Sequence, residues 1–283
     1  MPLSNGIYFA EFNPRQSEDP LTIVYLHGSG GNHLFWPSTL RRLPGCRTLS
    51  VDLPGHGKSD PPGRQSVSQY SQDIQHWLDD INIKQAVLIG YGLGGNIAIH
   101  LACKYPQWIQ GIILINTVIH QIIAQTLIDN LRNPVTAEHA VKMVIEKHMK
   151  LQTIKPGHKI FQKQILDVRP AVLAGDLIAY RENTFITSAN NITQPICILE
   201  GKTSKQQLTS DQNYALNLLP DAQIILPPHE SHILPIDEPQ WTANHILSFL
   251  RNTISCPASG VESSHLLDLS NQHMEGSLAI RTH

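Results

Sequence analysis

The 283-residue chain has 41% hydrophobic and 16% charged residues, which supplies a sizeable apolar core and excludes an intrinsically disordered protein. Its 21 Lys and Arg against 23 Asp and Glu give a formal net charge of −2, so it carries no basic excess for nucleic acid. No apolar run approaches the roughly 20 residues of a membrane span, no secretory signal opens the chain, and the four scattered cysteines favour a reducing, cytoplasmic location.

Short apolar runs alternate with longer amphipathic stretches along most of the chain. Continuous apolar runs are typical of parallel strands buried on both faces, and we expect strands at residues 21–26, 48–51, 86–89, 112–115, 196–199 and 224–226. Helical spacing predicts helices at 67–81, 93–104 and 239–250. This alternation predicts an α/β protein with a doubly wound, mostly parallel sheet, built from residues 1–116 and 195–252.

Two segments depart from this alternation. Residues 117–194 contain no convincing strand but have helical patterns at 122–131, 137–149, 160–168 and 171–180, separated by Pro134, Pro156 and Pro170. We therefore expect a helical cap, 117–194, inserted between two strands of the sheet. From about residue 253 to 283 the chain is polar and has no periodicity, which predicts a flexible C-terminal tail.

Three loops rich in small residues follow predicted strands. Segment 27–31 reads HGSGG, segment 52–59 reads DLPGHGKS, and segment 90–94 reads GYGLG and leads into a helix. The last has the strand–turn–helix context of a nucleophile elbow, whose pattern is G-x-S-x-G. Together with segment 232–239, HILPIDEP, these loops closely resemble the α/β-hydrolase superfamily of the AB hydrolase-1 type, from about residue 20 to residue 250.

The resemblance assigns a role to individual positions of this chain. It implies that the backbone N–H groups of Ser29 and Leu93 form an oxyanion hole and that His232 is the retained catalytic histidine. The nucleophile position is Gly92, which has no side chain to attack a substrate. The acid position, three residues after a glycine that follows strand 196–199, is Ser204, which is not an acid.

The absence of both a nucleophile at position 92 and an acid at position 204 predicts that the protein has no triad chemistry. Loss of the nucleophile costs on the order of 10⁶ in turnover, because the triad members act as a unit. Glycine at the elbow also avoids roughly 1 to 3 kcal/mol of backbone strain. We therefore expect a degenerate hydrolase that keeps an α/β-hydrolase fold and a pocket for a small apolar carbonyl compound.

Two alternatives stay open. One is an active carboxylic-ester or related acyl hydrolase that uses a non-standard nucleophile, and the other is a lyase or oxygenase-like enzyme with His232 as its base. A carboxylate within hydrogen-bond reach of His232 would distinguish these two enzymes from a degenerate hydrolase. Glu200 is the candidate for such a substitute acid. We expect no cofactor, because the glycine-rich run at 90–95 lacks the dinucleotide fingerprint, and no metal, because His229 and His232 have no evident third ligand.

Overall fold

A computed structural model of the chain describes residues 3–13, 20–118, 123–148, 156–182, 192–201, 219, 221–229 and 231–254. Eight strands form one sheet in the order β1-β2-β4-β3-β5-β6-β7-β8. Their bounds are β1 (Leu3–Ser4), β2 (Ile7–Phe12), β3 (Leu21–Leu26), β4 (Cys46–Val51), β5 (Ala86–Tyr91), β6 (Ile109–Ile115), β7 (Ile196–Leu199) and β8 (Gln223–Ile225). All six predicted strands are present, and β1 and β2 were not predicted.

The sheet is mostly parallel, as the apolar runs predicted. Strands β4, β3, β5, β6, β7 and β8 pair in parallel, whereas β1 pairs with β2 and β2 with β4 in antiparallel register. Every residue of β5 and of β7 is buried, which explains why these strands read as unbroken apolar segments. In β2 only Ile7 and Phe9 are buried, so this strand has one face in the core.

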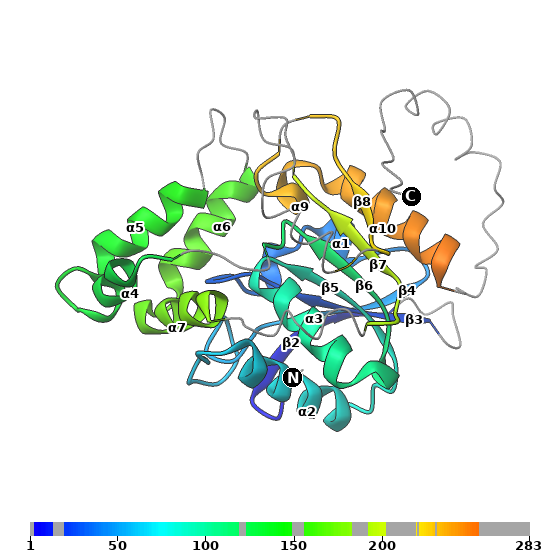
Figure 1. The fold of residues 1–283 in the computed structure, drawn as a ribbon, viewed down its shortest axis with the longest axis horizontal. Coiled ribbons are helices and arrows are strands. Elements are labelled where there is room, and N and C mark those ends of the chain that lie inside the picture. Colours follow the sequence, from blue (N-terminus) through cyan, green and yellow to red (C-terminus); the bar gives the residue numbers. More distant parts are fainter. Residues whose placement is uncertain are drawn as a thin grey trace.

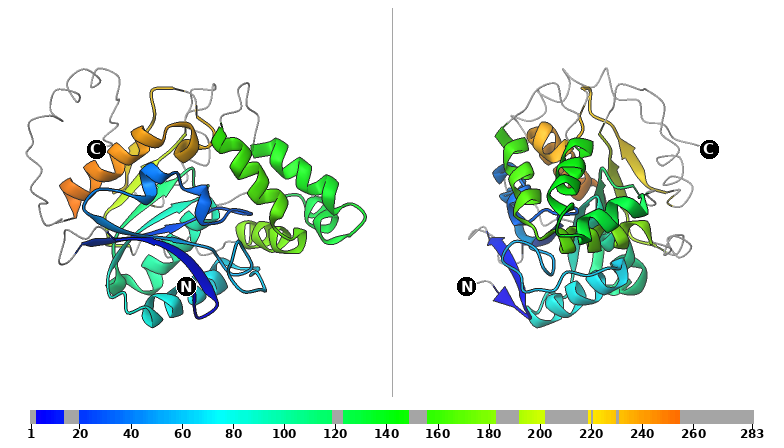
Figure 2. Two further views of the ribbon diagram at one scale, coloured as in Figure 1. Left: turned by 180° about the vertical axis from the view of Figure 1, so that it is seen from behind. Right: turned by 90° about the vertical axis from the view of Figure 1, so that its left-hand side faces the viewer.

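Helices cover both faces of this sheet. Helices α2 (Val67–Asp80) and α3 (Leu93–Lys104) pack together on one face, while α1 (Ser38–Arg41) and α10 (Pro239–Thr253) lie together on the other (Figures 1 and 2). Helix α9 (Leu234–Asp237) precedes α10, and short 3₁₀ turns occupy His33–Phe35 and Pro106–Trp108. Helix α10 continues three residues beyond the predicted end, through Thr253, and residues 255–283 of the predicted tail lie outside the described residues.

Four further helices come between β6 and β7. They are α4 (Gln125–Arg132), α5 (Ala137–His148), α6 (Pro156–Asp167) and α7 (Pro170–Arg181), and they lie together beside the sheet (Figure 1, in green). The described part of 117–194 contains no strand. No helix within the described ranges is both long enough and apolar enough to cross a membrane.

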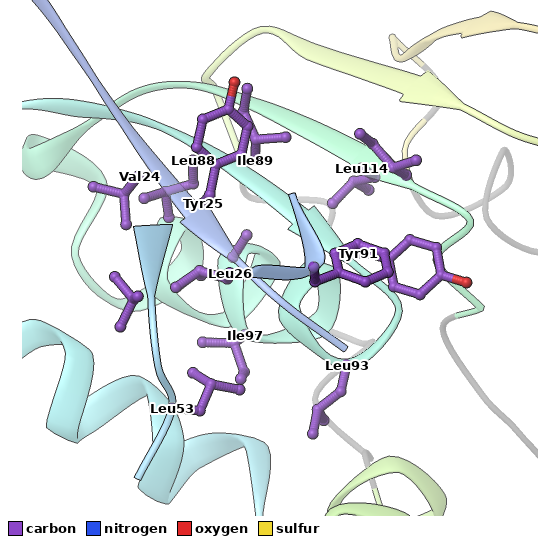
Figure 3. Packing of buried hydrophobic residues seen from close by; sticks show 14 of the residues in the cluster. Val24, Tyr25, Leu26, Leu53, Leu88, Ile89, Tyr91, Leu93, Ile97 and Leu114 are labelled. Atoms are coloured by element: carbon purple, nitrogen blue, oxygen red, sulfur yellow. The ribbon is translucent and has the colours of Figure 1, made fainter. Parts of the chain in front are cut away.

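The core extends along both faces of the sheet to the turn after β5. Figure 3 shows apolar side chains of β3 and β5 packed with those of α3 and of the segment after β4; those labelled include Leu26, Leu88, Leu53, Leu93 and Ile97. Tyr91 and Leu93, on either side of Gly92, point in different directions (Figure 3). The turn between them is therefore fixed by packing on both sides.

Candidate active site

The turn between β5 and α3 has the backbone of a nucleophile elbow. Gly92 caps α3 with φ 53° and ψ −116°, a positive-φ conformation in which glycine avoids the backbone strain expected at an elbow. Its N–H donates to the carbonyl oxygen of Ile115 at the end of β6, at 3.2 Å. A Cβ on Gly90 would collide with the backbone of Gly94, and a Cβ on Gly94 would collide with Leu26, so both flanking glycines are required by close backbone approach.

Position 92 itself has room for a side chain. A Cβ built on Gly92 would have as its nearest neighbours the hydroxyl oxygen of Tyr180 at 3.8 Å and the Cα of Gly28 at 4.0 Å, which are ordinary van der Waals distances. The backbone conformation, and not the space, is therefore what favours glycine here. The turn thus has the backbone shape of an elbow, and the residue at its tip has no side chain.

The loop after β3 holds one peptide bond in a fixed orientation beside the elbow. The carbonyl oxygen of Gly28 accepts hydrogen bonds from the N–H of Gly31, at 3.0 Å, and from Nδ1 of His27, at 2.7 Å. Because a trans peptide is planar, its N–H group, which belongs to Ser29, points in the opposite direction. Neither this N–H nor that of Leu93 has an acceptor within the described residues. Both groups assigned to the oxyanion hole are thus without a hydrogen-bond partner in the part of the chain that the structure describes.

His27 is a structural residue of this loop. Its Nε2 accepts the N–H of Leu53 at 3.0 Å, so the proton is on Nδ1 and the ring is neutral. Burial, followed by the nearby His56, lowers the pKa of His27 to about 4, which keeps the ring neutral at physiological pH. The tautomer of His27 therefore fixes the orientation of the Gly28–Ser29 peptide.

Asp237 organises the segment that carries His232. Its carboxylate accepts the backbone N–H groups of His232 and Ile233, each at 2.9 Å, and the hydroxyl of Ser231 at 3.1 Å. Nε2 of the buried His158, from α6, lies 2.6 Å from the other carboxylate oxygen. Burial alone would raise the pKa of Asp237, but the hydrogen bonds from Ile233, His158 and His232 outweigh it and the pKa is lowered. Asp237 is thus a charged anchor for the His232 loop.

The ends of β6 and β7 bring this loop to the same edge of the sheet as the elbow. Asn116, directly after β6, accepts the N–H of Leu234 at 3.3 Å. Gly201 lies so close to the carbonyl oxygen of Ser231 and to the side-chain amide of Asn116 that a Cβ there would collide with both. Since the carboxyl ends of parallel strands meet at one edge, Gly92 and the half-buried His232 belong to one side of the molecule. The role of His232 as the retained catalytic histidine stays a prediction.

The acid position lies outside the described residues, because these end at residue 201 and resume at 219. The assignment of Ser204 therefore stays a prediction. Glu200 follows β7 and donates its N–H to Ile225 at 3.2 Å. The pKa of Tyr91 is raised, first by burial and then by Tyr180, Glu200 and Asp237, so the charge of Glu200 acts close to the elbow. Whether Glu200 contacts His232 stays a prediction.

A buried network joins α7 to the two loops on the other side of the elbow. One oxygen of Asp176 accepts the N–H of Gly30 at 3.0 Å and lies 2.9 Å from Nε2 of His56, and the other accepts the hydroxyl of Tyr70 at 2.6 Å. Nδ1 of His56 faces the carbonyl oxygen of Pro54 at 3.1 Å. Both ring nitrogens thus face acceptors, so the ring carries two protons and a positive charge. Burial opposes this charge, but Asp176 outweighs it and the pKa of His56 is raised.

Sequence reasoning missed the two residues, His158 of α6 and Asp176 of α7, that contact these loops. Asp176 is the one acidic residue in the apolar stretch 171–180, and such a residue inside a buried helix signals a partnered carboxylate. His158 gave no comparable signal, because its segment is rich in charged and polar residues. The pairs His158–Asp237 and His56–Asp176, with side chains that are all less than 9% exposed, connect α6 and α7 to the loops of the site.

Comparisons with known proteins agree with this architecture. Residues 22–148 match the family model described as alpha/beta hydrolase fold. A putative 2-succinyl-6-hydroxy-2,4-cyclohexadiene-1-carboxylate synthase of Bacillus subtilis is 23% identical over 88% of this chain and 96% of that protein. The synthase of that name from an Enterobacter species is 37% identical over 32% of this chain and 36% of that protein, so the chain spans about a third of its length there.

Solved structures show the same fold. An enol-lactonase from Burkholderia xenovorans superposes with a TM-score of 0.77 and 17% identity, covering 87% of this chain and 96% of that one. A hydrolase from Pseudomonas aeruginosa gives a TM-score of 0.75 and 21% identity, covering 86% and 94%. The chain has the α/β-hydrolase fold. The family-model match over residues 22–148 agrees with this fold.

Proposed function

We propose that this protein is a degenerate α/β-hydrolase that binds a small carbonyl compound and does not form an acyl-enzyme. The observation that carries the proposal is an elbow of intact shape with Gly92 at its tip, beside two N–H groups, of Ser29 and Leu93, that have no acceptor within the described residues. The oxyanion site has persisted while the nucleophile has not. A pocket of this kind binds a carbonyl oxygen without attacking its carbon.

The size of the catalytic contribution that a nucleophile would make supports this proposal over an active triad enzyme. A loss on the order of 10⁶ in turnover corresponds to about 8 kcal/mol of barrier. A single oxyanion-hole donor contributes about 3 to 4 kcal/mol, so improved donors do not replace an absent nucleophile. We also propose that residues 117–194 act as the cap of this pocket and that the protein works in the cytoplasm.

A second candidate is a nucleophile-free lyase in which His232 is the base. The ordered backbone around His232, with Asp237 accepting two consecutive N–H groups, favours retention of a functional histidine. The likeness to a synthase over 88% of the chain also supports this candidate. Replacement of His232 by Ala would leave ligand binding nearly unchanged in a binding protein and would abolish turnover in a lyase.

The proposal is tested by covalent labelling. The purified protein is incubated with a fluorophosphonate probe and, in parallel, with 4-nitrophenyl acetate under burst conditions. We expect no labelled protein in intact-mass spectra and no burst of nitrophenol. A stoichiometric adduct, or a burst equal to the protein concentration, would show that another nucleophile acts in this pocket and would establish the active acyl hydrolase instead.

A further inference from the structure

Helix α7 places a polar side chain directly at the tip of the elbow. The hydroxyl oxygen of Tyr180 lies 3.8 Å from the point where a Cβ on Gly92 would stand, and the Tyr180 side chain is only 7% exposed. A serine Oγ would lie one bond beyond that Cβ. The Tyr180 hydroxyl is therefore within hydrogen-bond reach of the volume that a nucleophile's oxygen would fill.

The position of Tyr180 is fixed by the same helix. Asp176 precedes it by one turn, so both side chains project from the same face of α7. The Asp176 carboxylate is held by Gly30, His56 and Tyr70, and it has no exposed surface. An anchor of this kind sets both the height and the rotation of α7 over the elbow, so the phenol is held in place before a ligand arrives.

The polar groups around Gly92 could bind both oxygens of a group that carries two oxygens on one carbon. The resemblance assigns the N–H groups of Ser29 and Leu93 to one oxyanion hole. The hydroxyl oxygen of Ser29 is buried with no hydrogen-bond partner among the described residues. In acyl transfer the oxyanion occupies this hole while the nucleophile's own oxygen, at the tip of the elbow, is a second oxygen on the tetrahedral carbon. In this chain the group beside that second place is the Tyr180 hydroxyl.

Apolar side chains border the same loop. A Cβ on Gly30 would contact Ile165 and Leu173, each at 3.3 Å, and a Cβ on Gly28 would collide with the ring of Tyr91. The ring of Phe35 lies 4.6 Å from that of Tyr91, centre to centre. Apolar side chains thus lie beside the polar groups of this loop, which suits a ligand with a small polar head and an apolar body.

We propose that the site takes a small carboxylic acid with an apolar body, and that Tyr180 contacts it. One carboxyl oxygen accepts the N–H groups of Ser29 and Leu93, and the other accepts the hydroxyl of Tyr180. This inference rests on the proposed function and narrows its ligand from carbonyl compounds in general to acids.

The experiment uses two ligands that differ only at the carbonyl carbon. Phenylacetic acid, labelled with ¹³C in its carboxyl group, has two oxygens there, and phenylacetone, labelled in its carbonyl group, has one. Both are titrated into the full chain and into Tyr180→Phe by ¹³C NMR. Tyr25→Phe is the matched control, since Tyr25 is a buried phenol on β3 whose hydroxyl donates to Leu40 at 2.8 Å.

We expect the wild-type chain to prefer the acid. Tyr180→Phe should raise the dissociation constant of the acid by about ten-fold or more and shift the ¹³C resonance of the bound acid, because a hydrogen bond to a charged oxygen is lost. The dissociation constant of the ketone should stay within about two-fold of its wild-type value. Tyr25→Phe should leave the dissociation constants of both ligands unchanged. An equal effect of Tyr180→Phe on both ligands, or no effect on the acid, would overturn the role of Tyr180. Failure of both ligands to bind the wild-type chain would instead overturn the proposed function.

Discussion

Replacing Gly92 by alanine isolates the cost of the elbow's backbone conformation. The added Cβ meets nothing closer than 3.8 Å, so the substitution introduces no collision. Its only penalty is that alanine must adopt φ 53° and ψ −116°, which is sparsely populated by residues with a Cβ. We therefore expect Gly92→Ala to lower the free energy of unfolding by roughly 1 to 3 kcal/mol.

Gly94→Ala provides the contrast on the same turn. Gly94 has an ordinary helical position in α3, where alanine would normally stabilise a helix by up to about 1 kcal/mol. However, its Cβ would collide with the backbone oxygen of Leu26 and lie 2.7 Å from that of His27. Because neither backbone oxygen can move without displacing a central strand, we expect a loss of about 4 kcal/mol or more.

Urea unfolding of the wild-type chain, Gly92→Ala and Gly94→Ala measures the loss in free energy of unfolding for each variant. The transitions are followed by circular dichroism and by tryptophan fluorescence. The two probes should give coincident transitions with unchanged m values, so that shifts in midpoint report stability. If Gly92→Ala were as damaging as Gly94→Ala, space and not torsion would control position 92. If Gly92→Ala were neutral or stabilising, the strain argument for glycine at the elbow would be refuted.

Three further outcomes are expected. The pKa of His27 is lowered to about 4 in the folded protein. The neutral ring therefore contributes roughly 3 kcal/mol to the free energy of unfolding above about pH 6.5, and this contribution is lost as the pH falls toward 4. Between these pH values the urea midpoint should decline less in His27→Gln than in the wild-type chain. Asp176→Asn should cost about 3 to 5 kcal/mol, because it leaves the His56 cation buried without its partner. Since the pKa of His56 is raised, the stability from that pair is complete below about pH 6.5 and declines as the pH rises through the folded pKa, and this decline should be missing from the denaturation profile of Asp176→Asn. Gly92→Ser alone should restore little ester turnover, whereas Gly92→Ser with Ser204→Asp should restore far more than the sum of the single variants; an inert but folded double variant would show that the oxyanion hole has also decayed.

The fold was predictable where burial imposes a simple pattern. Strands β3 and β7 and helix α3 begin and end at the predicted residues, because both faces of each strand are buried and their apolar runs stop abruptly. Strands β1 and β2 were missed because they form an antiparallel edge. In β2 burial alternates and fades toward Phe12, leaving no continuous run to recognise.

The positions of the site were predictable from motifs, but their contacts were not. The spacing of small residues located Gly92 and Ser29, since close backbone approach excludes larger residues nearby. The contacts of His56 illustrate this difference. Its local bond to Pro54 follows from the loop, whereas Asp176 lies 120 residues further along the chain and meets it only through the packing of α7. Such pairings depend on tertiary structure that no local pattern encodes.

The buried pair between His56 and Asp176 determines how α7 can move. Lifting this helix away from the sheet would separate an imidazolium from a carboxylate and would also free the N–H of Gly30 and the hydroxyl of Tyr70. That cost is several kcal/mol, a large fraction of the stability of a typical protein. The amides of α7 should therefore exchange with solvent as slowly as those of the central strands, and by the same global opening. By this measure α7, although it is inserted between β6 and β7, unfolds together with the sheet.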